Sequence, residues 1–115
     1  MNIQRYESNH RISEVVAAGD ILYLSGQACG EGDIKNQTAH VLKRIEELLE
    51  ANGSDKDHLL RVEIFLSDVR DFTDMNELYD AWLVGHAKPA RACVVSSLVL
   101  ASFRLEVVVT AAKKE

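Results

Sequence analysis

An arginine and a glutamate stand inside two apolar segments, fifteen positions apart in the chain. Arg91 opens an expected strand over residues 91–95, and Glu106 lies between Leu105 and Val107 in an expected strand over residues 103–110. A guanidinium can bind a carboxylate or phosphate through two parallel hydrogen bonds. A carboxylate in partly apolar surroundings can act as a general acid or base. The pair predicts a site that binds an anion and moves protons.

Each of these charges also has a structural interpretation. Arg91 would then pair with a carboxylate at the edge of a sheet, and Glu106 would lie on a solvated strand face. The two strands are expected to be neighbours in the sheet. A period of two places Glu106 on the same face as Arg104 and Val108, opposite an apolar face that begins at Phe103.

Other polar residues offer weaker chemistry. Ser25 and Gly26 lie at a strand end, either in a simple turn or where the backbone approaches a ligand. Cys93 is expected to be a small core residue because its strand neighbours are apolar, and Cys29 is a loop thiol. The two cysteines and the four histidines follow no disulfide or metal-ligand spacing, so neither a metal nor a cofactor is expected.

The elements that must position these residues follow from apolar periodicity. Residues 1–11 form either a short edge strand or a loose arm. The remaining order is β-β-α-β-α-β-β, with strands over 12–17, 21–27, 59–66, 91–95 and 103–110. The first helix runs from an N-cap at Asp33 to Gly53, and the second from an N-cap at Asp71 to Gly85.

This order predicts an α+β fold, in which one mixed, mostly antiparallel sheet carries both helices on one face. The length of 115 residues fits a single domain over residues 1–115. The other face of the sheet has no cover from its own chain. We therefore expect subunits to cover one another there.

Composition excludes several classes of protein. The net charge of -5 argues against binding to nucleic acid, which usually requires a basic face. No apolar run approaches the roughly 20 residues that cross a bilayer. The N-terminus has no basic segment followed by an apolar one, so a cytoplasmic location is expected.

Three motifs carry a resemblance to a known family. YLSGQ at positions 23–27, PARACV at positions 89–94 and RLEV at positions 104–107 resemble the Rid family of reactive intermediate deaminases. These proteins are also described as endoribonuclease L-PSP-like or as translation inhibitors. The resemblance implies a chorismate-mutase-like fold and a homotrimer whose sheets form an inner barrel, with three clefts between subunits.

The resemblance also implies roles for individual residues. In deaminating members, the arginine matching Arg91 holds the carboxylate of a 2-imino acid, and the backbone at the position of Cys93 contacts the substrate. The glutamate matching Glu106 positions the attacking water, while Ser25 and Gly26 shape the cleft. No metal is needed, because a protonated imine is already electrophilic.

Two segments depart from the family pattern. In the turn before the last strand, the usual Leu-Pro is replaced by SLVL at positions 97–100. Deaminating members carry Gly-Pro-Tyr at the start of the first core strand, with the tyrosine in the cleft, whereas Ile12 occupies that place here. The preceding Arg11 could add a second positive charge to the cleft. This pattern resembles a side branch of the family.

Three functions follow from these observations. The first is hydrolysis of imino or enamino acids to 2-keto acids and ammonia, with Arg91 as carboxylate clamp and Glu106 as acid/base. The second is retention of a small carboxylate in the same cleft without turnover, as in a metabolite-binding or regulatory module. The third and weakest is ribonuclease or translation-inhibitor activity, which rests on family labels alone.

Overall fold

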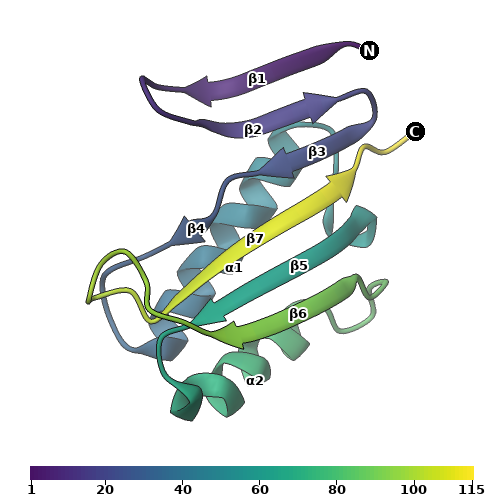
Figure 1. The fold of residues 1–115 in the computed structure, drawn as a ribbon. Helices are drawn as coiled ribbons and strands as arrows, with labels where there is room; N and C mark the ends of the chain where they lie inside the picture. Colours follow the sequence, from purple (N-terminus) through teal and green to yellow (C-terminus); the bar gives the residue numbers. More distant parts are fainter.

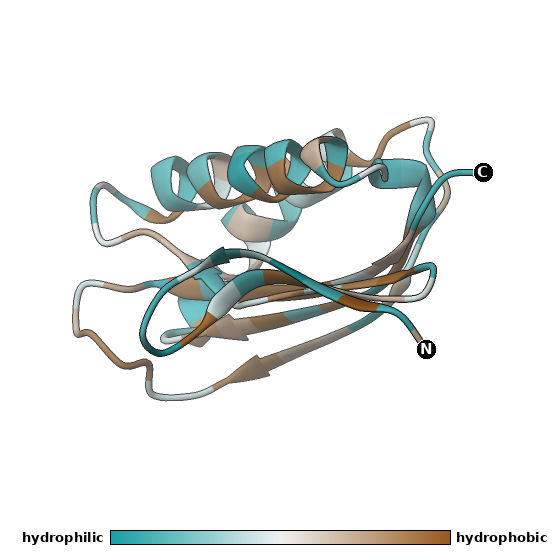
Figure 2. Ribbon diagram, turned by 90° about the horizontal axis from the view of Figure 1, so that it is seen from above, coloured by the Kyte–Doolittle hydropathy of each residue, from teal (hydrophilic) through white to brown (hydrophobic).

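The computed structural model describes residues 1–115 and consists of one sheet with two helices behind it (Figure 1). Seen from above, the helices form one layer and the strands another (Figure 2). The strands and helices in chain order are β1 (Ile3–Ser8), β2 (Ser13–Ala18), β3 (Ile21–Leu24), β4 (Gln27–Ala28), α1 (Ile34–Ala51), β5 (Leu59–Leu66), α2 (Phe72–Trp82), β6 (Ala90–Val95) and β7 (Leu105–Ala112). Short 3₁₀ turns at Lys56–His58 and Val69–Asp71 precede β5 and α2.

The sheet is mixed and mostly antiparallel, as the sequence predicts. Its strand order is β1-β2-β3-β7-β5-β6, and β4 pairs with β7 beyond the end of β3. Only β5 and β6 run parallel, and α2 makes the crossover between them that a parallel pair requires. The α+β prediction with both helices on one face is confirmed.

The expectation that the strands of Arg91 and Glu106 are neighbours is wrong. β5 lies between β6 and β7, and Ile64 on β5 pairs with Cys93 on one side and with Val107 on the other. The connection through α2 places β6 on the outer side of β5, at the edge of the sheet. The connection over residues 96–104 then passes back across the end of β5 to reach β7 (Figure 1).

The hydrophobic core lies between the sheet and the helices. Along β7 every second residue is buried, with Leu105, Val107 and Val109 at most 2% exposed, so the predicted alternation holds. On β5 the pattern differs at one place. A period of two counted from Val62 would bury Leu60, but a register shift between Leu59 and Arg61 turns Leu60 outward and buries Leu59 instead.

The predicted N-cap of α1 is confirmed, and Asp71 stands at the predicted N-cap position of α2 but makes no capping hydrogen bond. Asp33 accepts a hydrogen bond from the backbone N–H of Asn36, and the Asn36 side chain accepts one from the backbone of Asp33. Asp71 makes no such cap bond, because its carboxylate accepts from Arg104 instead. Phe72, the first residue of α2, is 44% exposed, although helical spacing would place it on the same stripe as buried Met75 and Tyr79.

The N-terminal strands also differ in detail from the prediction. Residues 1–11 include the edge strand β1, and the next strand begins at Ser13 instead of Ile12. The expected strand over residues 21–27 divides at Ser25 and Gly26 into β3 and β4. Neither helix has the length and apolar character needed to cross a membrane.

Candidate functional site

Arg91 extends from the edge strand β6 toward the helix layer. It pairs across the sheet with buried Val62, so both side chains face α2. Its Nη2 donates to Asn76 Oδ1 at 2.6 Å, and its guanidinium carbon lies 4.6 Å from the centre of the Tyr79 ring. No carboxylate lies within 4.0 Å of it, so Arg91 keeps its positive charge unpaired.

Glu106 extends from β7 onto the face of the sheet that the helices leave open. Its neighbours Leu105 and Val107 are buried, so the alternation of the strand turns Glu106 the other way. A Cβ atom built on Gly26 would lie 2.5 Å from Glu106 Oε2. The carboxylate therefore rests directly over the backbone of Gly26, where only glycine leaves room for it. Glu106 forms neither an ion pair nor a hydrogen bond within the chain.

The two charges do not meet within one chain. Glu106 pairs with Phe65 and Phe65 pairs with Val94, so Glu106 and Val94 are two strand spacings apart, roughly 10 Å. Arg91 lies three residues before Val94, about another 10 Å along β6, and on the opposite face of the sheet. A small molecule cannot contact both groups of the same chain.

The other predicted site residues lie in different parts of the sheet and do not form one cluster within the chain. Ser25 lies beside Gly26, and its hydroxyl donates to the backbone oxygen of Ser13 at 2.6 Å. The side chain of Cys93 is partly buried and packs against the core, as the sequence predicts.

Arg11 and Ile12 lie in the turn between β1 and β2. The Asn9 side chain fixes this turn by accepting from the backbone N–H groups of both residues, at 2.7 and 3.0 Å. Both side chains are exposed. The turn joins the edge strand β1 to β2, whereas Arg91 lies on β6 at the opposite edge of the sheet.

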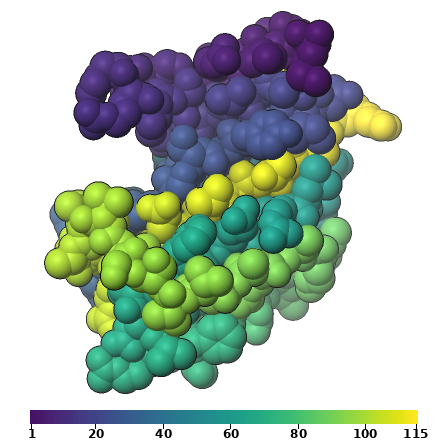
Figure 3. All heavy atoms as spheres, in the orientation of Figure 1, coloured from purple at the N-terminus to yellow at the C-terminus, as the bar shows by residue number.

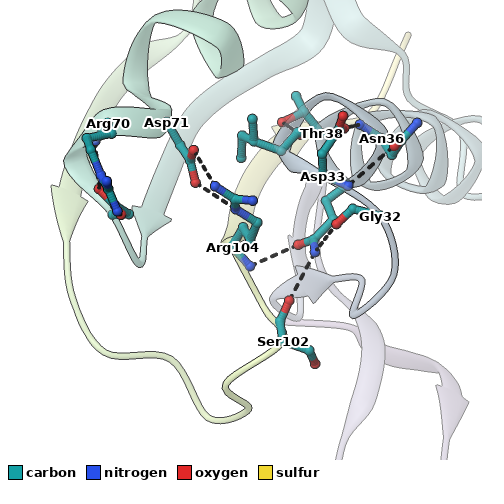
Figure 4. A network of polar contacts seen from close by, with 11 residues as sticks. Gly32, Asp33, Asn36, Thr38, Arg70, Asp71, Ser102 and Arg104 are labelled. Carbon is teal, nitrogen blue, oxygen red and sulfur yellow. Dashed lines mark hydrogen bonds and ion pairs between the residues drawn. The ribbon is translucent and has the colours of Figure 1, made fainter.

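The structure adds a polar network that sequence reasoning missed. Arg104 donates through Nε and Nη2 to both oxygens of Asp71, at 2.9 and 2.8 Å (Figure 4). Gln37, which is 1% exposed, accepts from the backbone N–H of Arg104 and donates to the backbone oxygens of Gly32 and Ser102. These bonds join the start of β7 to both helix N-termini. A glutamine at a buried helical position was the available signal.

The largest surface hollow contains none of the predicted site residues. It has a volume of about 560 Å³ and lies at the N-terminus of α1. A second hollow of about 340 Å³ lies between the outer surfaces of α1 and α2, beside Trp82. The first is lined by Cys29, Gly30, Glu31, Gly32, Asn36 and His40.

Comparisons with known proteins show which family the chain belongs to. The model of the endoribonuclease L-PSP family matches residues 2–113. The RutC family protein YoaB of Escherichia coli is 36% identical over 113 residues, which are 97% of this chain and 99% of that protein. The chain belongs to the Rid family. This family is the one also named YjgF, RutC and L-PSP.

Solved structures of Rid family members have the same fold. A YjgF family protein from Neisseria meningitidis superposes with a TM-score of 0.96 at 39% identity, and the match covers 100% of this chain and 98% of that one. A Rid family protein from Yersinia pestis gives a TM-score of 0.86 at 29% identity, over 91% and 90% of the two chains. The chorismate-mutase-like fold of the Rid family is therefore the fold of this chain.

Proposed function

We propose that this Rid family protein is a homotrimeric deaminase that hydrolyses 2-imino or enamino acids to 2-keto acids and ammonia. The observation that carries the proposal is the pair of unpaired charges, the cation of Arg91 and the carboxylate of Glu106. Both side chains are partly buried, and partly buried charges without a partner in their own chain are typical of ligand sites.

The proposed reaction uses each charge once. Arg91 binds the substrate carboxylate, and the backbone of β6 at Cys93 lies along the same strand to receive the rest of the molecule. A water held by Glu106 adds to C2 of the protonated imine and gives a proton to the carboxylate. Glu106 returns that proton to nitrogen. The C2–N bond then breaks as the new C2 hydroxyl gives its proton back to Glu106, and ammonia leaves with the 2-keto acid formed.

The homotrimer is supported by the positions of these groups. Arg91 and Glu106 of one chain are too far apart and on opposite faces, so one cleft would take Arg91 from one subunit and Glu106 with Gly26 from the next. Figure 3 shows the open face of the sheet. This face also carries exposed apolar side chains, including Tyr23 at 50% and Val94 at 47%. A sedimentation mass near the 12.8 kDa of one chain would remove both the trimer and the cleft.

The test of the deaminase is a coupled assay in which an amino-acid oxidase generates 2-imino acids. We expect the wild type to speed keto-acid release above the rate in free solution, and R91A and E106Q to abolish that gain. R70A and E47Q are the matched controls, because they remove one exposed charge of each sign away from the proposed cleft. A wild-type rate equal to that of free solution would contradict the proposal.

A second candidate is a binding module that retains a carboxylate metabolite in the same cleft without turnover. It is favoured by Ile12, an exposed aliphatic residue with no group for proton transfer at the tyrosine position of the resemblance. This function predicts that 2-keto acids raise the melting temperature and that R91A removes the shift, while the coupled assay stays flat.

Ribonuclease or translation-inhibitor activity is the weakest candidate. Only the family name supports it, whereas the net charge of -5 opposes contact with a phosphate backbone. RNA binding that weakens steeply with salt would favour it. A cytoplasmic location stays a prediction of the sequence.

A further inference from the structure

Two uncharged side chains of α2 hold the guanidinium of Arg91. Asn76 accepts one hydrogen bond from Nη2 at 2.6 Å, and the Tyr79 ring lies against the guanidinium at 4.6 Å from its carbon. The two residues are three positions apart on one helix, so both reach the same side of β6. Arg91 is therefore restrained by one in-plane contact and one stacking contact.

The Tyr79 ring is a fixed surface. It is 6% exposed, belongs to the core cluster and lies 6.3 Å from the Trp82 ring. Burial raises the pKa of its hydroxyl, so the residue stays neutral and does not offset the charge of Arg91. Ordering a mobile arginine side chain costs about 2 kcal/mol of rotamer entropy. Because Tyr79 already orders Arg91 in part, a ligand has less of this cost to overcome when it binds.

We propose that Asn76 and Tyr79 are positioning residues that keep Arg91 ordered and fully charged for a planar carboxylate. The inference rests on the proposed function, in which Arg91 is the carboxylate clamp. Asn76 uses one hydrogen of Nη2 and Tyr79 covers one face, so the donors left for a ligand lie at the remaining edge of the guanidinium. A carboxylate fits such an edge with two parallel hydrogen bonds.

Neutral partners are essential to this arrangement. An acidic residue at position 76 would hold Arg91 equally well and would compete with the ligand for the same charge. An aliphatic residue at position 79 would fill space but would offer no electron-rich face to the cation. The side-chain types at these two positions therefore select for anion binding.

The first test reads Arg91 itself and needs no ligand. In ¹⁵N-labelled protein, the Nε–H resonance assigned by its loss in R91A should be ordered and shifted upfield by the ring current of Tyr79. Y79F should keep that shift, and Y79L should lose it. An Arg91 resonance as mobile in the wild type as in Y79L would overturn the positioning role, whatever the protein binds.

The second test measures binding of pyruvate, the smallest 2-keto acid, by titration calorimetry. We expect Y79F to bind like the wild type, Y79L to bind roughly 3- to 30-fold more weakly, and N76D at least about 10-fold more weakly. N76D is nearly isosteric, so it keeps the test decisive if Y79L fails to fold. Thermal melts of all variants separate loss of binding from loss of structure.

The outcomes separate this inference from the proposed function. Unchanged pyruvate affinity in folded Y79L and N76D would overturn the positioning role while the clamp, judged by R91A and by turnover, still stands. Absence of both pyruvate binding and turnover in the wild type would overturn the clamp, and the ligand part of the inference with it.

Discussion

Arg91 and Arg104 lie at opposite sides of β5, and their partners differ in charge. Arg104 donates two hydrogen bonds to the Asp71 carboxylate, which is 7% exposed, and this contact raises the pKa of Arg104. Arg91 has only the amide of Asn76 and the ring of Tyr79. The charge of Arg104 is balanced by a carboxylate of its own chain, whereas the charge of Arg91 has no such partner within the chain.

The chemical type of the partner distinguishes a structural arginine from a functional one. When a carboxylate already binds an arginine through two hydrogen bonds, the positive charge is paired within the chain. Mutating such an arginine mainly lowers the stability of the fold. An arginine held by neutral groups adds little to folding and still attracts an anion. Exposure alone would not distinguish them, because both are partly buried.

The largest effects are expected when Arg91 and Arg104 are each replaced by alanine and the two variants are compared. R91A should lower turnover by at least about 100-fold, to the rate in free solution, and change the free energy of unfolding by less than about 1 kcal/mol. R104A should leave the nearly buried Asp71 carboxylate unpaired and destabilise the fold by roughly 1–3 kcal/mol, with most turnover per folded molecule retained. The coupled assay and urea unfolding measure both. Equal losses of stability in the two variants would break the comparison.

Gln37 provides a second test on the structural side. Q37L removes one acceptor and two donor contacts, and leaves the backbone N–H of Arg104 and the oxygens of Gly32 and Ser102 without their partner. We expect a loss of roughly 1–3 kcal/mol in unfolding free energy and faster hydrogen exchange over residues 102–105. H40L on the exposed side of α1 is a control for the helix itself, and it should change neither quantity.

Gly26 sharpens the comparison on the functional side. G26A places a Cβ atom 2.5 Å from Glu106 Oε2, so the carboxylate must move from its position over the backbone. We expect turnover to fall about 10-fold with little change in stability, because a misplaced catalytic group loses rate steeply. G30A crowds Ser102 Oγ at 2.9 Å instead, and should leave turnover intact. Equal turnover in the two variants would argue against a role for Glu106.

The smallest effect is expected at a third arginine, which is exposed. Hydrogen bonds from Arg70 lower the pKa of Asp68 from 3.8 to about 2. This carboxyl group has a lower pKa when folded, so its contribution to stability is present above about pH 4 and is lost as the pH falls toward 2. Unfolding of the wild type and D68N at pH 5 and pH 3 measures it. A difference between the two proteins that grows on acidification would contradict this sign.

Local features of the fold were predictable from the sequence, and pairings between distant segments were not. The strand over 59–66, the cap at Asp33 and the alternation around Glu106 follow from side-chain period and hydrogen bonding within a few residues. The position of β5 between β6 and β7 depends on the α2 crossover, which no period encodes. The bulge at Leu60 could not be predicted either, because it belongs to the pairing of β5 with the distant strand β7.

The candidate site was predictable by residue type but not by arrangement. Arg91 and Glu106 stand out as charges in apolar strands, and Tyr79 lies four residues from both Met75 and Leu83, which is the spacing of one helix face. Asn76 gives no pattern, because a half-buried amide looks like any polar helix residue. Asp71 was expected to cap α2, and its pairing with Arg104 is a contact across 33 positions that sequence spacing does not signal.

The opposite placement of Arg91 and Glu106 on one chain has a genetic consequence. In the proposed trimer, R91A and E106Q are each inactive alone, but a cleft between an E106Q subunit and an R91A subunit can hold both intact groups. Random assembly of the two at equal amounts would restore about a quarter of the clefts, one half multiplied by one half. Two defective alleles expressed together would complement each other, and a tandem fusion that fixes the subunit order would set how many clefts recover.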